Sequence, residues 1–320
     1  MKNTVLVLCM LYLVVSCKNE SKLEEDIAKI PMQVNIERFD KLFSKASLKD
    51  LPALKKEYPF MFSEKYTDSF WLARMRDTLQ IRLFDEVEKV FPEINNMHHD
   101  IQSMFQHITY YFPEFKPPRV ITTTSYIDYR NRIIVTDTIA LISIDNYLGS
   151  DHEFYLGIQK YIRQDFNPQQ IVVDLAGEYA KKYIYQKQNT TLLDEMIFYG
   201  KQLYFKDVVI PFKTEAERIS YTQEQLDWAR ANESYIWRYF VERELLFSTD
   251  SKLPSRFINP APFTKFYLEE IDSESPSRLG QYTGWQIVKS YMENNDISLR
   301  DMLQTSSEEI FNKSKFKPKK

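Results

Sequence analysis

Residues 118–148 of this 320-residue chain read PRVITTTSYIDYRNRIIVTDTIALISIDNYL, and this stretch decides the fold class. Its two apolar runs, 120–127 and 133–144, are rich in Thr, Ile, Val and Tyr, which are residue types that favour β-strands. The polar link 128–132 between the runs predicts a hairpin, and the alternation in 142–145 predicts an edge or half-buried strand. We therefore expect a small sheet in this region.

Helical patterns flank this sheet on both sides. Apolar residues recur every three to four positions within 33–115, a stretch without glycine that ends in a proline-rich segment, 113–118. After Gly149 we expect helices at 169–186, at 191–205 across Gly200, at 222–247 behind a capping box that starts at Thr222, and at 284–292. The chain is thus predicted to be an α+β protein, predominantly α-helical, with a small β-sheet around 118–148.

Composition excludes several classes of function. The chain has only six glycines, all after residue 148, and it contains neither GxGxxG nor GxxxxGK[ST], so the common phosphate-binding loops are missing. The formal net charge is −3, so the chain lacks the excess of positive charge that is typical of nucleic-acid-binding proteins. With four histidines, two cysteines and no HExxH or GxSxG motif, we expect no cofactor, no metal and no enzymatic activity.

The N-terminus has the pattern of a bacterial lipoprotein signal. Lys2 precedes an apolar run, 5–15, that is too short to span a membrane as a helix. The run ends in Ser16 and Cys17, similar to a lipobox, so residues 1–16 are expected to be removed and Cys17 to carry the lipid that anchors the protein in the membrane. A charged tether up to residue 31 and a single α-rich domain, 32–320, would follow. A lysine directly after Cys17 favours the outer membrane, with the protein facing the periplasm.

Two carboxylates stand out as candidate site residues. Glu233 lies seven residues after Leu226 on an apolar helical stripe, so we expect it to be buried and to need a partner such as an arginine or backbone donors. It is either one half of a structural ion pair or a carboxylate in a functional groove. Glu178 stands four residues before Lys182, which is the spacing of an ordinary helical surface pair.

Histidines, lysines and aromatic residues offer further candidates. His98 and His99 are adjacent on an expected helix, where neighbouring side chains diverge by about 100°, so we expect them to face solvent rather than to share a metal. Aromatic clusters at 110–112 and 263–267 are candidate partner surfaces. The C-terminal lysines form either a solvated tail or a contact with anionic lipid or a partner. They are Lys313, Lys315, Lys317, Lys319 and Lys320.

Motifs spread over the whole mature chain resemble one family. They are IERFD at 36–40, IDNYLG at 144–149, MIFYGKQLYF at 196–205, YTQEQ at 221–225, NESYIW at 232–237, APF at 261–263, GWQIVKSYM at 284–292 and SKFKP at 314–318. In this order they are similar to the gliding motility lipoproteins GldB of Bacteroidetes. The resemblance implies a cell-envelope lipoprotein that is needed for gliding, is linked to the envelope machinery that also serves protein secretion, and has no enzymatic activity.

A second resemblance concerns the fold alone. The order of hairpin, helix 169–186 and helix 191–205 is similar to a group of predicted zinc peptidases, in which the first helix carries HExxH and the next offers a glutamate before a glycine. The matching positions here are Gly177, Glu178, Lys181 and Tyr199. All three metal ligands would then be lost. The resemblance implies a zincin-like pseudoenzyme with an inherited peptide-binding groove.

From these patterns we expect a non-catalytic lipoprotein that docks to envelope proteins of the gliding or secretion apparatus. Two alternatives remain open at this point. One is a zincin-like peptidase or cell-wall hydrolase that uses Glu178 or Glu233, and the other is a chaperone-like binder of exported peptides.

Overall fold

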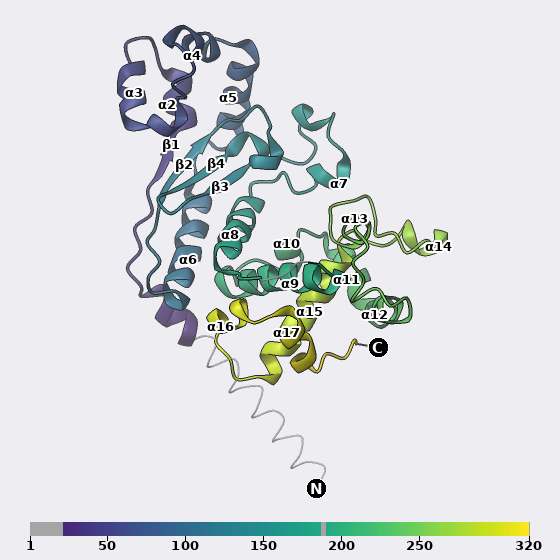
Figure 1. The fold of residues 1–320 in the computed structure, drawn as a ribbon. Helices are drawn as coiled ribbons and strands as arrows, with labels where there is room; N and C mark the ends of the chain where they lie inside the picture. The colour runs from purple at the N-terminus through teal and green to yellow at the C-terminus, as the bar shows by residue number, and fades with distance from the viewer. Residues whose placement is uncertain (1–21, 187–189, 320) are drawn as a thin grey trace, which may run out of the picture.

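The computed structural model describes residues 22–186 and 190–319. Within these residues the protein is an α+β fold in which helices surround one small sheet, as the sequence predicts (Figure 1). The sheet lies between an N-terminal lobe of helices and a larger body formed by the C-terminal helices. No helix in this described part is both long enough and apolar enough to cross a membrane.

Four short strands form the sheet in the order β1-β2-β4-β3. They are β1 (Ile36–Arg38), β2 (Arg119–Thr123), β3 (Ile133–Val135) and β4 (Ile139–Ser143). β2 pairs in parallel with both β1 and β4, whereas β3 pairs antiparallel with β4. Three strands therefore come from the predicted stretch. β1 lies in a region whose spacing predicts helix, because a three-residue strand is too short to show an alternation.

The prediction of a hairpin at 128–132 is wrong. This link joins β2 to β3, which are not neighbours in the sheet, and it contains the 3-10 helix η2 (Tyr129–Asn131). The hairpin is instead formed by β3 and β4, and the backbone N–H of Ile139 donates to the Thr136 hydroxyl at 3.0 Å in its turn. The stretch 142–145 is not an edge either, because β4 lies inside the sheet and all four residues are buried.

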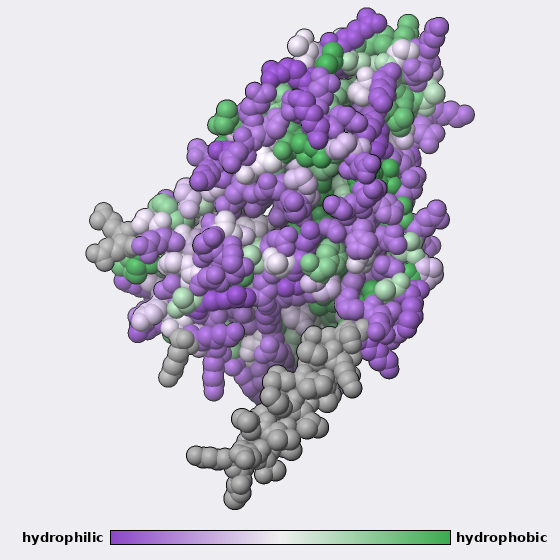
Figure 2. Space-filling model, turned by 180° about the vertical axis from the view of Figure 1, so that it is seen from behind, coloured by the Kyte–Doolittle hydropathy of each residue, from purple (hydrophilic) through white to green (hydrophobic). Residues whose placement is uncertain are grey.

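The helices before β2 form the N-terminal lobe and one wall of the larger core. They are α2 (Phe39–Lys45), α3 (Leu51–Glu57), η1 (Pro59–Met61), α4 (Asp68–Met75), α5 (Thr78–Val90) and α6 (Asn95–Tyr111). Neighbouring residues of β2 face two cores: Val120 packs into the large core with α6, and Ile121 packs into a smaller core under α2–α4. Apolar side chains are visible on the lobe at the top of Figure 2. Exposed ones are Leu42, Leu48, Phe60, Tyr66, Phe70, Leu79 and Ile81.

After the sheet the chain is helical again. Its elements are η3 (Ile144–Asn146), η4 (Glu153–Tyr155), α7 (Lys160–Arg163), α8 (Gln170–Tyr183), α9 (Leu192–Val209), α10 (Glu215–Ile219), α11 (Gln223–Ala231), α12 (Glu233–Glu242), α13 (Leu253–Phe257), α14 (Glu269–Asp272), α15 (Leu279–Asn294), α16 (Leu299–Gln304) and α17 (Ser307–Ser314). The helices predicted at 169–186, 191–205 and 284–292 are confirmed as α8, α9 and part of α15.

The prediction of a single helix over 222–247 is wrong, because Asn232 separates two helices. It is the C-cap of α11 and the N-cap of α12. Both the side-chain amide and the backbone N–H of Asn232 donate to the carbonyl oxygen of Trp228, at 2.9 and 3.1 Å. An asparagine that bonds to the backbone of its own helix competes with continuation of that helix. The apolar spacing, which continues across the break, does not reveal this competition.

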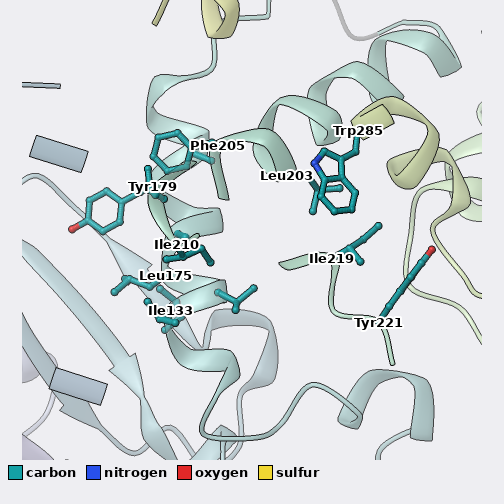
Figure 3. Packing of buried hydrophobic residues seen from close by; sticks show 14 of the residues in the cluster. Ile133, Leu175, Tyr179, Leu203, Phe205, Ile210, Ile219, Tyr221 and Trp285 are labelled. Carbon is teal, nitrogen blue, oxygen red and sulfur yellow. The ribbon is translucent and has the colours of Figure 1, made fainter. Parts of the chain in front are cut away.

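Two glycines allow α9 and α15 to cross at very short range. A Cβ on Gly200 would lie 2.4 Å from the carbonyl oxygen of Gly284, and a Cβ on Gly284 would lie 1.8 Å from that of Met196. Both distances are far inside van der Waals contact, so only glycine fits at the crossing. Trp285 of α15 and Leu203 of α9 belong to the large core around it (Figure 3).

The described residues begin inside the segment predicted as a tether. Residues 22–28 are helical, and Ile27 of this helix is buried. The side-chain amide of Gln106 on α6 donates to two backbone carbonyls of the same segment, at 3.2 and 2.9 Å. The predicted tether is therefore folded against α6 from residue 22 on. The predicted signal, 1–16, and Cys17 lie outside the described residues.

Candidate functional site

One face of α8 carries Gly177 and Lys181, two of the positions that the sequence singled out. Gln170, Asp174, Gly177 and Lys181 follow one another at helical spacing on this face. Gly177 lies against α9, since a Cβ built there would be 3.3 Å from Cε and 3.5 Å from Nζ of Lys206. The end of the Lys206 side chain therefore occupies the space that a larger side chain at position 177 would take.

Lys206 belongs to a group of charged side chains from five separate segments, which we call the charge cluster. Its members are Arg132, Asp165, Asp174, Lys206 and Arg278. Nε of Arg132 lies 2.8 Å from Oδ2 of Asp174, and the Tyr147 hydroxyl donates to the same oxygen at 2.8 Å. Nζ of Lys206 donates to the Arg218 carbonyl at 3.2 Å, and Nη2 of Arg278 donates to the Ser220 carbonyl at 2.6 Å. These contacts connect the sheet edge with α8, and they connect both α9 and the start of α15 with residues 218–220.

Burial shifts the titration of two cluster members in opposite directions. It raises the pKa of Asp165 to about 6, although the nearby charges of Arg278 and Arg132 act to lower it. It lowers the pKa of Lys206 to about 8, although Asp174 acts to raise it. Desolvation is the largest cause in both cases, because surroundings of low dielectric disfavour the charged form of each group. Burial therefore disfavours the charged forms of these groups, and the Arg132–Asp174 ion pair together with the other nearby opposite charges acts against this cost.

The shift at Lys206 makes the free energy of unfolding depend on pH. Because its folded pKa of about 8 lies below the ordinary value of 10.5, its stabilising contribution is fully present above pH 10.5 and is lost as the pH falls through 8. Between pH 8 and 10.5 we expect the wild type to gain roughly 1–3 kcal/mol relative to a Lys206→Met variant. Denaturant unfolding of both proteins measures this difference, and parallel pH profiles would contradict it.

The four positions of the predicted degenerate metal site have separate surroundings. Gly177 faces Lys206, and Tyr199 is half-buried on α9. Oε1 of Glu178 pairs with Nζ of Lys181 at 2.5 Å, so the predicted pairing of Glu178 with Lys182 is wrong by one residue. Among the described residues, no group of three or more His, Cys, Asp or Glu side chains is arranged to hold a metal ion.

The adjacent histidines diverge, as their positions on a helix predict. Nε2 of His98 lies 2.8 Å from the carbonyl oxygen of Val34, whereas the side chain of His99 is exposed. The expectation that both rings face solvent is therefore wrong for His98, which is half-buried against the segment before β1.

Glu233 is buried, as its place on the apolar stripe predicts, with 4% of its surface exposed. Among the described residues, its hydrogen-bond partners do not include the arginine that the sequence suggests as one possibility. The Tyr282 hydroxyl of α15 donates to Oε2 at 2.8 Å, and the backbone N–H of Lys319 donates to Oε1 at 2.9 Å. Burial and then the charge of Glu233 raise the pKa of Tyr282, so its hydroxyl stays protonated as a donor. Glu233 thus ties α12 to α15 and to the C-terminal tail.

The C-terminal tail is held by its backbone and by Phe316, whose ring centroid lies 5.2 Å from that of Trp237. The lysines of this tail point their charges toward solvent. Lys313, Lys315, Lys317 and Lys319 are exposed, and Lys320 lies outside the described residues. Nζ of Lys313 pairs with Oε1 of Glu309 at 2.8 Å.

A proline at position 319 removes one hydrogen bond and keeps the chain length. Lys319→Pro lacks the N–H that Glu233 accepts, so a buried carboxylate oxygen loses a donor. We expect the variant to be about 1–2 kcal/mol less stable than the wild type in denaturant unfolding. Lys319→Ala, which keeps the N–H, is the control and should match the wild type. Equal stability of the two variants would contradict a role for this contact.

A groove of about 500 Å³ runs between α12 and the segment 266–271. Its apolar lining includes Tyr235, Ile236, Tyr239, Phe266, Leu268 and Ile271. The predicted partner surface at 263–267 contributes one lining residue, Phe266, while the rest comes from α11, α12, α14 and the residues at their ends. The spacing of Tyr235 and Tyr239, four residues apart on one helical face, is the sequence signal that points to the groove. In the other predicted cluster, 110–112, Phe112 is buried in the large core.

Arginines border this groove. The guanidinium of Arg238 lies 5.1 Å from the ring centroid of Tyr235, and that of Arg243 lies 5.8 Å from the ring centroid of Tyr239. Among the described lining residues, Glu242 offsets Arg238, whose Nε lies 4.0 Å from its Oε1, so the lining carries a net balance of one positive charge. An apolar wall beside a positive rim is complementary to an apolar segment that carries carboxylates.

Comparison with known proteins identifies a family but no related structure. No curated protein and no solved structure matches the chain, so the resemblance to zinc peptidases finds no support. A family model described as "Gliding motility protein GldB" matches residues 20–318, which is nearly the whole chain. The chain therefore belongs to the GldB family of gliding motility proteins.

Proposed function

We propose that the protein is a non-catalytic lipoprotein of the cell envelope, which supports gliding by docking to proteins of the motility and secretion machinery. Membership of the GldB family supports the role in gliding. The lipobox-like end of the apolar run, Ser16 and Cys17, supports lipidation at Cys17. Lys18 supports a place in the outer membrane, with the folded part in the periplasm.

The lipid would hold the folded part close to the membrane. The helix at 22–28 packs against α6, and residue 22, the first that the structure describes, lies five residues after Cys17. Five residues reach at most about 18 Å when fully extended. A domain on so short a connection would meet partners that are embedded in the same membrane or attached to it.

The groove along α12 is the observation that carries the docking proposal. Single exposed apolar side chains are common on protein surfaces, whereas a groove that gathers several of them marks a binding site. Tyr235 and Leu268 are both exposed in this groove. The occupant that we propose is a segment of an envelope protein with apolar side chains between carboxylates, which would meet Arg238 and Arg243.

A carboxylate placed in the groove tests this proposal. Cells with Tyr235→Glu should glide at a small fraction of the normal speed, because an acidic segment meets a like charge that costs about 1–3 kcal/mol of binding. Tyr235 is 61% exposed, so stability should change by about 0.5 kcal/mol or less and the protein should accumulate normally.

The matched control is Leu156→Glu, which places the same charge at a side chain that is 70% exposed on another segment. This variant should glide like the wild type. Normal gliding by Tyr235→Glu cells would remove the groove from the proposal. Equal loss of gliding in both variants would point to a general effect of surface charge.

A further inference from the structure

A second hollow lies where the carboxyl ends of β1 and β2 meet the N-terminal lobe, and we call it the strand-end cavity. Its volume is about 150 Å³. Aromatic side chains from the lobe form much of its wall: Phe43, Phe62, Trp71 and Phe84. Thr123 and Thr124, at the end of β2, are also in the lining. The carboxyl ends of parallel strands are common places for ligands, because the chain leaves a crevice there.

Trp71, which lines this cavity, carries an unpaired donor. Its side chain lies on α4 and the residue is 8% exposed. Within the described residues its indole Nε1 is buried without a hydrogen-bond partner. Buried donors in folded proteins nearly always have a partner, because an unmade hydrogen bond costs free energy. A ligand that carries an acceptor would supply the missing partner.

Two other polar groups of the lining already have partners. The carboxylate of Asp40 accepts from Nη2 of Arg38 at 2.6 Å and from the Thr122 hydroxyl at 2.5 Å. The side-chain amide of Gln80 donates to the Thr124 hydroxyl at 2.7 Å. The negative charge of Asp40 is therefore neutralised by a direct ion pair and does not dominate the cavity.

Arg74 adds a positive charge to the lining. Its side chain is half-buried, and its guanidinium lies 4.5 Å from the ring centroid of Tyr126. In the described part of the chain, no carboxylate lies within ion-pair distance of this guanidinium. Aromatic walls, one unpaired N–H and one cation without an anion thus surround the same small space.

We propose that the strand-end cavity binds a compact aromatic carboxylate. A single ring suits the walls, since an apolar cavity of about 150 Å³ accommodates benzene. The carboxylate accepts a hydrogen bond from Nε1 of Trp71 and faces the charge of Arg74. A free aromatic acid and the C-terminal aromatic residue of a peptide both carry this chemistry. The site goes beyond the docking groove, from which it is separate in sequence and lining.

The indole signal of Trp71 provides a direct test. The chain has four tryptophans, so the mature full chain labelled with ¹⁵N-tryptophan in a non-aromatic detergent gives four Nε1–H signals, and Trp71→Phe identifies one of them. Benzoate should shift the Trp71 signal saturably and leave the other three in place. Benzene, which lacks an acceptor, should bind at least tenfold more weakly.

Arg74→Met supplies a second variant at a half-buried position, which keeps the test valid if Trp71→Phe does not fold. This variant should weaken the binding of benzoate at least tenfold and leave the binding of benzene unchanged. Tighter binding of N-acetylphenylalanine than of benzoate would identify a peptide terminus as the source of the ligand, and the reverse order would identify a free acid. The proposal is overturned if neither acid shifts the Trp71 signal saturably, or if all four signals move together.

Discussion

A Gly284→Ala substitution is expected to prevent the chain from folding stably. The new Cβ would lie 1.8 Å from the carbonyl oxygen of Met196 on α9, and a backbone atom cannot move aside as the end of a flexible side chain can. Relief of this overlap requires α9 and α15 to separate, which opens the core around the fully buried Trp285. We expect a loss of more than about 4 kcal/mol, a large share of the 5–15 kcal/mol that stabilises a typical domain.

Gly157→Ala is the matched control for this prediction. No heavy atom lies within 4 Å of a Cβ built on Gly157, so its unfolding transition should match that of the wild type. Circular dichroism and thermal unfolding of both variants measure the difference. A Gly284→Ala protein that unfolds at the wild-type temperature would contradict the close crossing of α9 and α15.

Asp174→Ala is expected to have the second largest effect. It leaves the guanidinium of Arg132 without its carboxylate 2.8 Å away, and the buried Tyr147 hydroxyl loses its acceptor. The two side chains are only 18% and 15% exposed, and removing one partner of a largely buried ion pair costs up to about 3–5 kcal/mol, because the remaining charge stays desolvated. Denaturant unfolding at pH 7 measures this loss.

An exposed ion pair serves as the control for the Asp174→Ala prediction. Asp137 pairs with Lys182 but is 91% exposed, so Asp137→Ala should cost about 1 kcal/mol or less. The double variant Arg132→Met with Asp174→Ala should recover part of the stability lost in Asp174→Ala, since no uncompensated charge remains. Equal effects of Asp174→Ala and Asp137→Ala would mean that the charge cluster does not hold these elements together.

The sequence predicts the fold class and the main helices because their signals are local. The β-branched residues of 118–148 locate the strands, and the spacing of apolar residues locates α8, α9 and α15. Strand pairing is not local: β2 and β4 are parallel neighbours, and the segment between them crosses over through β3. The break at Asn232 depends on one side chain bonding to its own helix, which an apolar pattern does not encode.

In the candidate site, too, the sequence reveals the local features but not the contacts between distant segments. The apolar stripe predicts that Glu233 is buried, but its donor at Lys319 lies 86 residues away and is a backbone group that any residue type other than proline provides. The charge cluster draws its members from positions 132 to 278, in a chain that is 27% charged, so no spacing distinguishes them. Of the groove, the sequence predicts only the cluster that contains Phe266, because α12 and 266–271 meet only in the folded chain.

Site-specific photo-crosslinking in gliding cells tests the central proposal, docking through the groove, most directly. A photoreactive residue at Ile271, which lines the groove, should crosslink to one envelope protein. The same crosslink should disappear when Tyr235→Glu is added, and it should not form from position 156. Crosslinks that form equally from 271 and 156, or that persist in the Tyr235→Glu background while its gliding is normal, would contradict docking through this groove.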